Sequence, residues 1–355
     1  MKKFTAMAFA GMMALSLVGC SGAAGNGTTA AAATEAAVES VVTTTENVGT
    51  AMETEAKPET ITIQAWNGSR EAAEVEVPYD PQRIAVLDMP ALDIIDSLDL
   101  GDRIVGSAKV SIEYLTQYNP DDSDGMIANL GSVKTADFEQ VAICEPDIIF
   151  IGGRLSESYD ALSEIAPVVY LGGDYEKGIV QSTEDNAKTI ASIFGLEEEI
   201  DGKMAGYQER MDALREVLSG KNVLLSMYNN NAMSIMDTNS QLNIIAKELG
   251  AKNLGETIGE TEKATHGEEA SWETIVKLDP EYMFVLDRST ATEAADNGIL
   301  GAREVIENDL IKETDVYKNG NIVYFIEHAN VWYTSTGGIQ ALDTMLSDLE
   351  EALLP

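Results

Sequence analysis

The chain has 355 residues, and its 60 Asp and Glu against 23 Lys and Arg give a formal net charge of −37. A charge this negative argues against binding to nucleic acid and against electrostatic attraction to anionic lipid. Two Cys and two His argue against a disulfide scaffold, a cysteine-rich metal cluster and a histidine-rich metal site, while 45% apolar residues suffice for one large or two ordinary domains.

The first 19 residues are predicted to be a signal peptide. Lys2 and Lys3 precede an uncharged apolar stretch, residues 4–18, which is shorter than the about 20 residues that span a membrane. The sequence Leu-Val-Gly-Cys that ends at Cys20 resembles the lipobox of bacterial lipoproteins, whose cysteine thiol carries the lipid. We therefore expect a protein anchored through Cys20 on the extracytoplasmic face of a bacterial cell membrane. The alternative is an ordinary signal in which Cys20 is incidental.

Residues 20–59 are predicted to be a disordered tether. They are rich in Ala, Thr and Glu and contain no aromatic residue. Such a composition buries too little apolar surface to offset the entropy lost on ordering.

Residues 60–195 are predicted to form an α/β lobe. Asn67-Gly68 lies between two short alternating strands and indicates a hairpin. Strands and helices then alternate, which is typical of a mostly parallel sheet. The expected strands are 83–88, 104–107, 148–152 and 168–171, and the expected helices are 90–98, 112–118, 138–144 and one from residue 156.

Residues 196–219 are predicted to be one connecting helix, because apolar residues recur at spacings of three and four from Ile200 to Leu218. A second alternating series fills residues 220–355. Its expected strands are 223–227, 234–236, 282–286 and 322–325, and its expected helices are 242–249, 272–278 and a last one ending at 353. The predicted fold class is therefore α/β, with two similar lobes joined by a single long helix.

The two series share an internal repeat. DFEQVAICEPDIIFIGGR (137–154) aligns without a gap with SWETIVKLDPEYMFVLDR (271–288), and Arg154 coincides with Arg288 at the end of each predicted strand. Ligands of open α/β sheets lie outside the carboxyl ends of the strands, and paired guanidinium groups recognise anionic oxygens. The repeat therefore predicts two arginines facing one cleft. The alternative is that each pairs with a nearby acid, such as Asp287 beside Arg288.

The repeat, together with four further stretches, resembles the substrate-binding lipoproteins of ferric siderophore ABC importers, of the catecholate (enterobactin or petrobactin) type. These stretches are PQRIAVLDMPALDIIDSLDLGDRIVG (81–106), ATHGEEASWETIVKLDPEYMFVLDR (264–288), ENDLIKETDVYKNGNIVYF (307–325) and VWYTSTGG (331–338). The resemblance covers nearly all of residues 60–355. It implies the class III arrangement of two lobes joined by one helix, which close only slightly on the ligand, and we expect a monomer.

The same resemblance implies a set of pocket residues. Arg154 and Arg288 match arginines that face the catecholate oxygens, and His266 and Tyr333 match a pair that can complete the coordination of Fe(III), a hard ion that accepts phenolate and imidazole. Trp332 either stacks on the aromatic ligand or has a structural role.

Two departures from the family pattern affect the expected ligand. Gln241 stands where the family often has a third pocket arginine, so the pocket is predicted to be less basic and to suit a ligand of lower charge. The loop between Tyr324 and Trp332 is longer than usual and contains His328, which is a candidate substitute for His266 as an iron ligand.

Two equivalent acids, Glu139 and Glu273, match the residues with which the family docks onto permease arginines. The alternative is a favourable interaction with their own helix N-termini. Cys144 is predicted to be a buried, inert thiol.

The predicted function is an extracytoplasmic solute-binding lipoprotein that captures a ferric catecholate siderophore between two lobes and delivers it to an ABC importer. It is not predicted to be an enzyme or to hold an intrinsic cofactor. Haem or a corrinoid is the alternative ligand, and an extracytoplasmic enzyme or a surface adhesion protein is the alternative class. No Gly-x-Ser-x-Gly, phosphate-loop or His-Glu-x-x-His motif favours an enzyme.

Overall fold

The computed structural model describes residues 57–122, 124–258, 271–292 and 300–354. Residues 56–355 form one compact unit. The predicted signal peptide, Cys20, most of the tether and His266 lie outside the described residues. None of the helices in those described ranges is both long and apolar enough to cross a membrane.

The described chain begins with the predicted hairpin. Strand β1 (Thr60–Trp66) pairs antiparallel with β2 (Ala72–Pro78), and Trp66 lies opposite Ala72. The side-chain oxygen of Asn67 accepts hydrogen bonds from the backbone N–H groups of Ser69 and Glu71, which closes the turn. The last turn residue, Arg70, has a φ of 62°.

The first sheet is parallel and has the strand order β5-β4-β3-β8-β9. Every residue of β3 and β8 is buried, as expected for a sheet covered on both faces. Its strands are β3 (Ile84–Leu87), β4 (Ile104–Ser107), β5 (Ala128–Asn129), β8 (Ile148–Ile151) and β9 (Val168–Tyr170), and its helices are α1 (Met89–Ser97), α2 (Phe138–Ile143) and α3 (Tyr159–Ser163). A small hairpin pairs β6 (Gly131–Ser132) with β7 (Thr135–Ala136).

The second sheet has the order β11-β10-β13-β14, with β12 also paired to β10. Only β11 runs antiparallel to its neighbour among these pairings. The strands are β10 (Asn222–Asn229), β11 (Ala232–Ile235), β12 (Lys252–Asn253), β13 (Tyr282–Asp287) and β14 (Ile322–Phe325). The accompanying helices are α7 (Asn243–Lys247), α8 (Trp272–Leu278), α9 (Arg288–Ala291), α10 (Ala302–Ile306), α11 (Asp315–Lys318), α12 (Ala329–Thr334) and α13 (Ile339–Leu353).

The two segments of the internal sequence repeat, 137–154 and 271–288, also share local structure. Asp137 and Ser271 each cap a helix by accepting a hydrogen bond from the backbone N–H three residues later. Glu145 and Asp279, which coincide in the alignment, both adopt left-handed backbone, with φ of 44° and 49°. The strands that follow, β8 and β13, each lie between two parallel neighbours of their sheet. The predicted fold class of two similar α/β lobes is confirmed.

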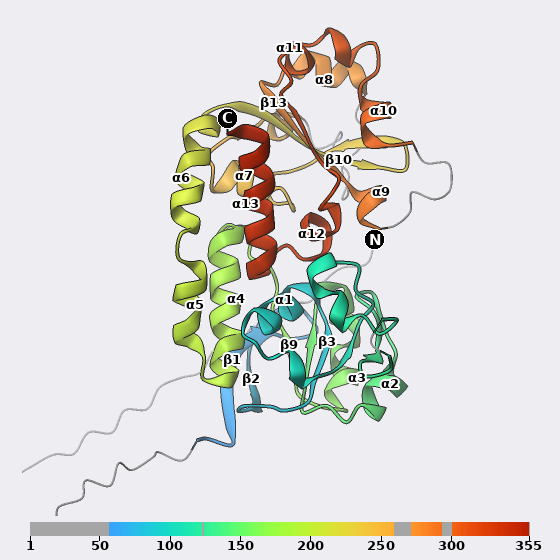
Figure 1. Ribbon diagram of the computed structural model, residues 1–355, viewed down its shortest axis with the longest axis vertical. Coiled ribbons are helices and arrows are strands. Elements are labelled where there is room, and N and C mark those ends of the chain that lie inside the picture. Colours follow the sequence, from blue (N-terminus) through green and yellow to red (C-terminus); the bar gives the residue numbers. More distant parts are fainter. Residues whose placement is uncertain (1–56, 123, 259–270, 293–299, 355) are drawn as a thin grey trace, which may run out of the picture. The chain divides into compact units, whose positions relative to one another are not determined.

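The predicted single connecting helix is wrong in detail. Residues 196–219 form two helices, α5 (Glu197–Met204) and α6 (Tyr207–Leu218), separated by an extended Ala205 and by Gly206 with a φ of 90°. A further helix that was not predicted, α4 (Ile179–Phe194), precedes them and packs against α5 (Figure 1). The apolar stripe continues across the break, but a residue with positive φ ends the helical hydrogen-bond ladder.

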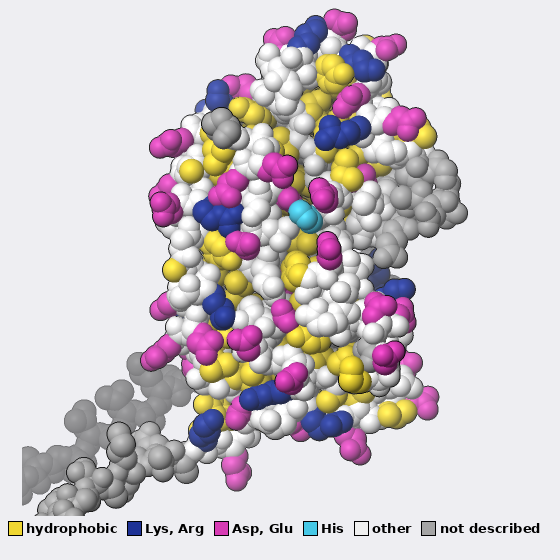
Figure 2. Space-filling model, in the orientation of Figure 1, with side chains coloured by type: hydrophobic (Ala, Val, Ile, Leu, Met, Phe, Trp, Pro, Cys, Tyr) yellow, Lys and Arg dark blue, Asp and Glu magenta, His cyan; other side chains and the backbone are white. Residues whose placement is uncertain are grey.

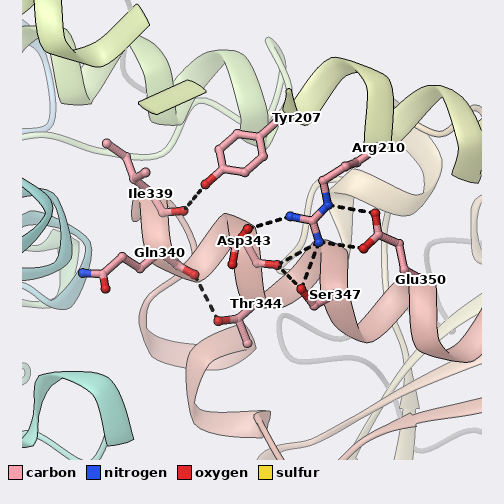
Figure 3. A network of polar contacts seen from close by, with 8 residues as sticks. All are labelled: Tyr207, Arg210, Ile339, Gln340, Asp343, Thr344, Ser347 and Glu350. Carbon is pink, nitrogen blue, oxygen red and sulfur yellow. Dashed lines mark hydrogen bonds and ion pairs between the residues drawn. The ribbon is translucent and has the colours of Figure 1, made fainter. Parts of the chain in front are cut away.

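Hydrogen bonds connect helix α13 to α6 and to α1. Arg210 of α6 donates two hydrogen bonds to the Glu350 carboxylate, at 2.8 and 2.7 Å, and one to Asp343, at 2.6 Å (Figure 3). The fully buried Asp93 of α1 accepts backbone N–H bonds from Gln340 and Ala341, both at 2.9 Å, and so caps the first turn of α13. The C-terminal helix therefore contacts elements from both halves of the chain.

Candidate ligand-binding cleft

A cleft of about 380 Å³ opens at the carboxyl ends of β3, β8 and β9, the edge at which open α/β sheets bind ligands. Its walls come from both halves of the chain. The first half contributes Trp66, Arg70, Asp88, Met89, Pro90, Val133, Gly152, Gly153, Arg154, Tyr170, Leu171, Gly172, Gly173, Tyr175 and Asn186, and the second contributes Gln241, Tyr333, Thr334, Thr336 and Gly337.

Tyr333 of α12 lies between the two predicted arginines. The Cζ atoms of Arg154 and Arg288 are each 5.3 Å from the centre of its ring, within the range of a cation–π contact. Arg288 Nε also donates a 2.7 Å hydrogen bond to the Tyr333 hydroxyl, and its Nη1 donates one of the same length to the side chain of Asn229. The structure thus brings Arg154, Arg288 and Tyr333 together.

Neither guanidinium is neutralised by an acid among the described residues. No carboxylate there lies within ion-pair distance of Arg154 or Arg288. Asp287, the neighbour expected to compete for Arg288, instead accepts a hydrogen bond from the backbone N–H of Thr290 and caps α9. Arg154, which lines the cleft, therefore keeps its donors for a ligand.

One carboxyl group lines the cleft beside these cations. Asp88 caps α1 by accepting a hydrogen bond from the Ala91 N–H, and it packs so closely on Gly152 that a Cβ there would lie 2.3 Å from the carboxyl oxygen. Burial raises the pKa of Asp88 to about 6, and the charge of Arg154 opposes this rise.

A second hollow of about 310 Å³ adjoins the first and shares Met89, Val133, Arg154, Tyr333 and Thr334 with it. Lys109 and Lys134 add two cations to its wall, and Lys109 also forms a 3.3 Å ion pair with Asp121. Sequence reasoning missed both lysines because Lys109 follows β4 in a loop and Lys134 lies in the turn between β6 and β7. It also missed Trp66 and Arg70, for which the only signal was the hairpin turn between β1 and β2.

Of the described residues predicted to bind the ligand or its iron, Arg288, Trp332 and His328 do not line the cleft. Arg288 contacts Tyr333, which does line it. Trp332 is fully buried, stacks on Phe325 with ring centres 4.0 Å apart and donates a 2.8 Å hydrogen bond to Asp348. His328 Nδ1 lies 2.7 Å from the same carboxylate, in a separate hollow. The structure therefore favours the structural alternative for Trp332 and places His328, the candidate substitute for His266, outside the cleft.

The remaining predicted residues occupy varied places. Gln241 lines the cleft, and Glu139 and Glu273 are exposed in the first turns of α2 and α8. Cys144 is a buried free thiol whose pKa is raised by burial, as expected for an inert cysteine. Within the described residues, no group of three or more His, Cys, Asp or Glu is placed to hold a metal ion.

Comparison with known proteins gives consistent matches. The family model described as "Periplasmic binding protein" matches residues 84–328, so the β1–β2 hairpin precedes the matched region. The petrobactin-binding protein YclQ of Bacillus subtilis is 33% identical over 78% of this chain and 84% of its own length. The ferric-anguibactin-binding protein FatB of Vibrio anguillarum is 24% identical over 76% of this chain and 81% of its own.

Solved structures agree with the sequence matches. The crystal structure of YclQ superposes with a TM-score of 0.74 and 31% identity, covering 84% of this chain and all of the other. The periplasmic catecholate-siderophore binding protein VctP of Vibrio cholerae superposes with a TM-score of 0.70 and 28% identity, covering 82% of this chain and all of the other.

Proposed function

The chain belongs to the periplasmic binding protein family, and we propose that it captures a ferric catecholate siderophore in its cleft and delivers the complex to an ABC importer. The observation that carries this proposal is the position of Tyr333 between the guanidinium groups of Arg154 and Arg288. Guanidinium forks suit the negatively charged oxygens of catecholates, and nearby aromatic rings suit the catechol ring. The names of YclQ, FatB and VctP, all siderophore-binding proteins, support the same ligand class.

An acidic protein can bind an anionic ligand when positive charges lie close to the binding site. Figure 2 shows Asp and Glu side chains spread over the face it draws, with fewer Lys and Arg among them. Charges separated by more than about 8 Å are largely screened at physiological salt. The ligand would therefore respond mainly to the charges nearest to it. Arg154 lines the cleft, Arg288 contacts Tyr333 at its wall, and Lys109 and Lys134 line the adjoining hollow.

The iron of the ligand is the cargo, and the protein completes its coordination only if the siderophore leaves sites open. A siderophore with two catechols supplies four oxygens, and Fe(III) accepts six donors. Tyr333 lines the cleft with its hydroxyl positioned by Arg288. Tyr333 and His266 are the residues we assign to the two remaining positions.

Delivery requires a membrane anchor and a docking surface. We assign the anchor to a lipid on Cys20, which places the protein on the extracytoplasmic face of the cell membrane, and YhfQ of Bacillus subtilis, 26% identical over 80% of this chain, is itself named a putative substrate-binding lipoprotein. We assign the docking contacts to Glu139 and Glu273, which project from equivalent helices, α2 and α8, of the two lobes. A monomer suffices for this role.

The arginine pair provides the direct test of the site. Arg154→Ala and Arg288→Ala are each expected to weaken binding of a ferric bis-catecholate by about 1–3 kcal/mol, because Arg154 supplies charged hydrogen-bond donors to the cleft and Arg288 holds the Tyr333 hydroxyl in it. Isothermal titration calorimetry measures the loss. Arg303→Ala is the matched control, since that side chain is 62% exposed and lies outside the cleft. Affinities unchanged in both arginine variants would refute the site.

A further inference from the structure

The turn of the N-terminal hairpin reaches the cleft. Trp66 at the end of β1 and Arg70 in the turn both line it, although the hairpin precedes the region matched by the family. We propose that this turn is a recognition element of the binding site, in which Arg70 contacts an anionic oxygen of the ligand beside Arg154 and Trp66 packs against an aromatic ring of the ligand. The inference rests on the proposed function and names the part of the molecule that selects an aromatic, anionic ligand.

The turn is seated on the first lobe. A Cβ on Gly68 would lie 3.1 Å from both the carbonyl oxygen of Ser156 and the Cβ of Tyr159, so the turn packs directly on the segment that follows β8. Arg70 strengthens this contact, because its Nη2 donates a 2.9 Å hydrogen bond to the Gly153 carbonyl and its Nε lies 3.3 Å from the Ser156 hydroxyl. The residue after Gly153 is Arg154, so the two arginines come from adjoining segments of one wall.

Arg70 occupies a backbone conformation that favours glycine. Its φ of 62° is left-handed, a region that non-glycine residues adopt at a cost and that often marks functional positions. The bonds to Gly153 and Ser156 use two of the five N–H donors of the guanidinium. In the described part of the chain no carboxylate forms an ion pair with Arg70. Donors are thus left for a ligand, and Arg70 adds a cation to the cleft that the uncharged Gln241 also lines.

Close contacts with Tyr170 and Gly172 hold the Trp66 side chain in place. Its ring meets Tyr170 edge to face, with centres 5.3 Å apart. A Cβ on Gly172 would lie 2.1 Å from the indole, so only glycine leaves room for the ring there. Asn186 fixes this loop through a 3.2 Å hydrogen bond to the Gly172 carbonyl. The indole is therefore a fixed aromatic wall next to two cations, which suits a ring that carries negatively charged oxygens.

The test is calorimetric titration of the full chain with a ferric bis-catecholate. Arg70→Gly is expected to lower the affinity about tenfold, because it removes a charged donor. The unfolding midpoint is expected to change little, because the relief of the left-handed backbone offsets the lost bonds to Gly153 and Ser156. Arg70→Lys keeps the charge and is expected to retain most of the affinity. Arg303→Gln changes the net charge equally outside the cleft and is expected to bind like the wild type.

Each other outcome overturns the inference. Arg70→Gly binding within twofold of the wild type excludes contact with the ligand while leaving the proposed function intact. Arg70→Lys binding as weakly as Arg70→Gly would show that Arg70 only positions the Gly153 carbonyl. A wild-type chain that binds no ferric catecholate refutes the proposed function, and this inference with it.

Tryptophan fluorescence gives a second readout. Ferric catecholates absorb strongly and quench nearby indoles, so Trp66→Phe is expected to remove more than half of the ligand-induced quenching. Quenching of the same size in Trp66→Phe would place the ligand away from the hairpin.

Discussion

Tyr333 is the residue on which the binding site depends. Two guanidinium groups lie against its ring, and one of them also hydrogen-bonds its hydroxyl. Its sequence neighbour Trp332 lies buried against Phe325 and Asp348 instead. Successive residues of a helix point about 100° apart. On α12, Tyr333 therefore faces the cleft while its neighbour Trp332 faces the core. Resemblance identified the pair, but only the helix orientation separates the cleft residue from the core residue.

Tyr333→Phe provides a spectroscopic prediction. If the phenolate binds Fe(III), the wild-type complex has a phenolate-to-iron charge-transfer band in visible absorption, and the variant lacks it, because the donor oxygen is gone. Tyr175→Phe is a matched control, since that tyrosine also lines the cleft but is not assigned to iron. A band that persists in Tyr333→Phe would assign the iron–oxygen bond to another group.

Asp88 predicts a pH dependence of binding. Burial raises the pKa of this carboxyl to about 6 in the folded protein. Its contribution to the free energy of unfolding is therefore fully present at pH values below about 4, where the carboxyl is protonated, and is lost as the pH rises through about 6. Over the same range Asp88 becomes negative beside Arg154 and opposes an anionic ligand. Affinity for a ferric bis-catecholate is therefore expected to fall between pH 5 and pH 7 more in the wild type than in Asp88→Asn.

Asp88→Asn retains an oxygen that can cap α1 and removes the titration. Comparing the two proteins by calorimetry at each pH cancels the protonation of the siderophore itself. Equal pH profiles in the two proteins would contradict a role for Asp88.

At the scale of elements, most of the fold was predicted from the spacing of apolar residues and from the capping residues, glycines and prolines that bound helices and strands. The helix–turn–strand repeat located both strand-end arginines, because a cap, a proline turn and a buried strand together define one unit. The break between α5 and α6 was missed, since the apolar spacing from Ile200 to Leu218 is maintained across Gly206. Cations on loops and turns, such as Lys109 and Lys134, were also missed. The spacing of apolar residues locates helices and strands, but it does not show which loop residues line a cleft.

The contact between α6 and α13 gives a stability prediction. Arg210 is 24% exposed and binds Asp343 and Glu350, and this contact holds the pKa of Glu350 below its usual range. Arg210→Met is expected to lower the free energy of unfolding by about 1 kcal/mol, because the partly buried Glu350 carboxylate loses its partner, while the exposed Asp343 contributes little. Urea denaturation measures the change. Lys203→Met on α5 is the control and is expected to change it by less than about 0.5 kcal/mol; equal effects would contradict a specific role for the Arg210 cluster.

At the scale of the whole molecule, one buried core unites the two lobes. Apolar residues of β3 and β8 belong to the same contiguous cluster as residues of β10, β13 and α13. Rigid coupling of this kind suits a binding protein whose lobes close only slightly, as the family resemblance implies. Composition argued against nucleic-acid binding and metal-rich sites, and the repeat predicted the two-lobed fold. The position of the hairpin turn at the cleft depends on tertiary packing, which no local sequence pattern records.

The central claim is that the cleft around Tyr333 binds a ferric catecholate, and one titration tests it most directly. Fluorescence of the purified protein is followed while a ferric bis-catecholate, a ferric tricatecholate, a ferric hydroxamate, haemin and cobalamin are added in turn. Trp66 lines the cleft and reports occupancy. The expected result is saturable, submicromolar quenching by a ferric catecholate and a weaker response to the hydroxamate. Saturable binding of haemin or cobalamin alone, or no response to any catecholate, would contradict the claim.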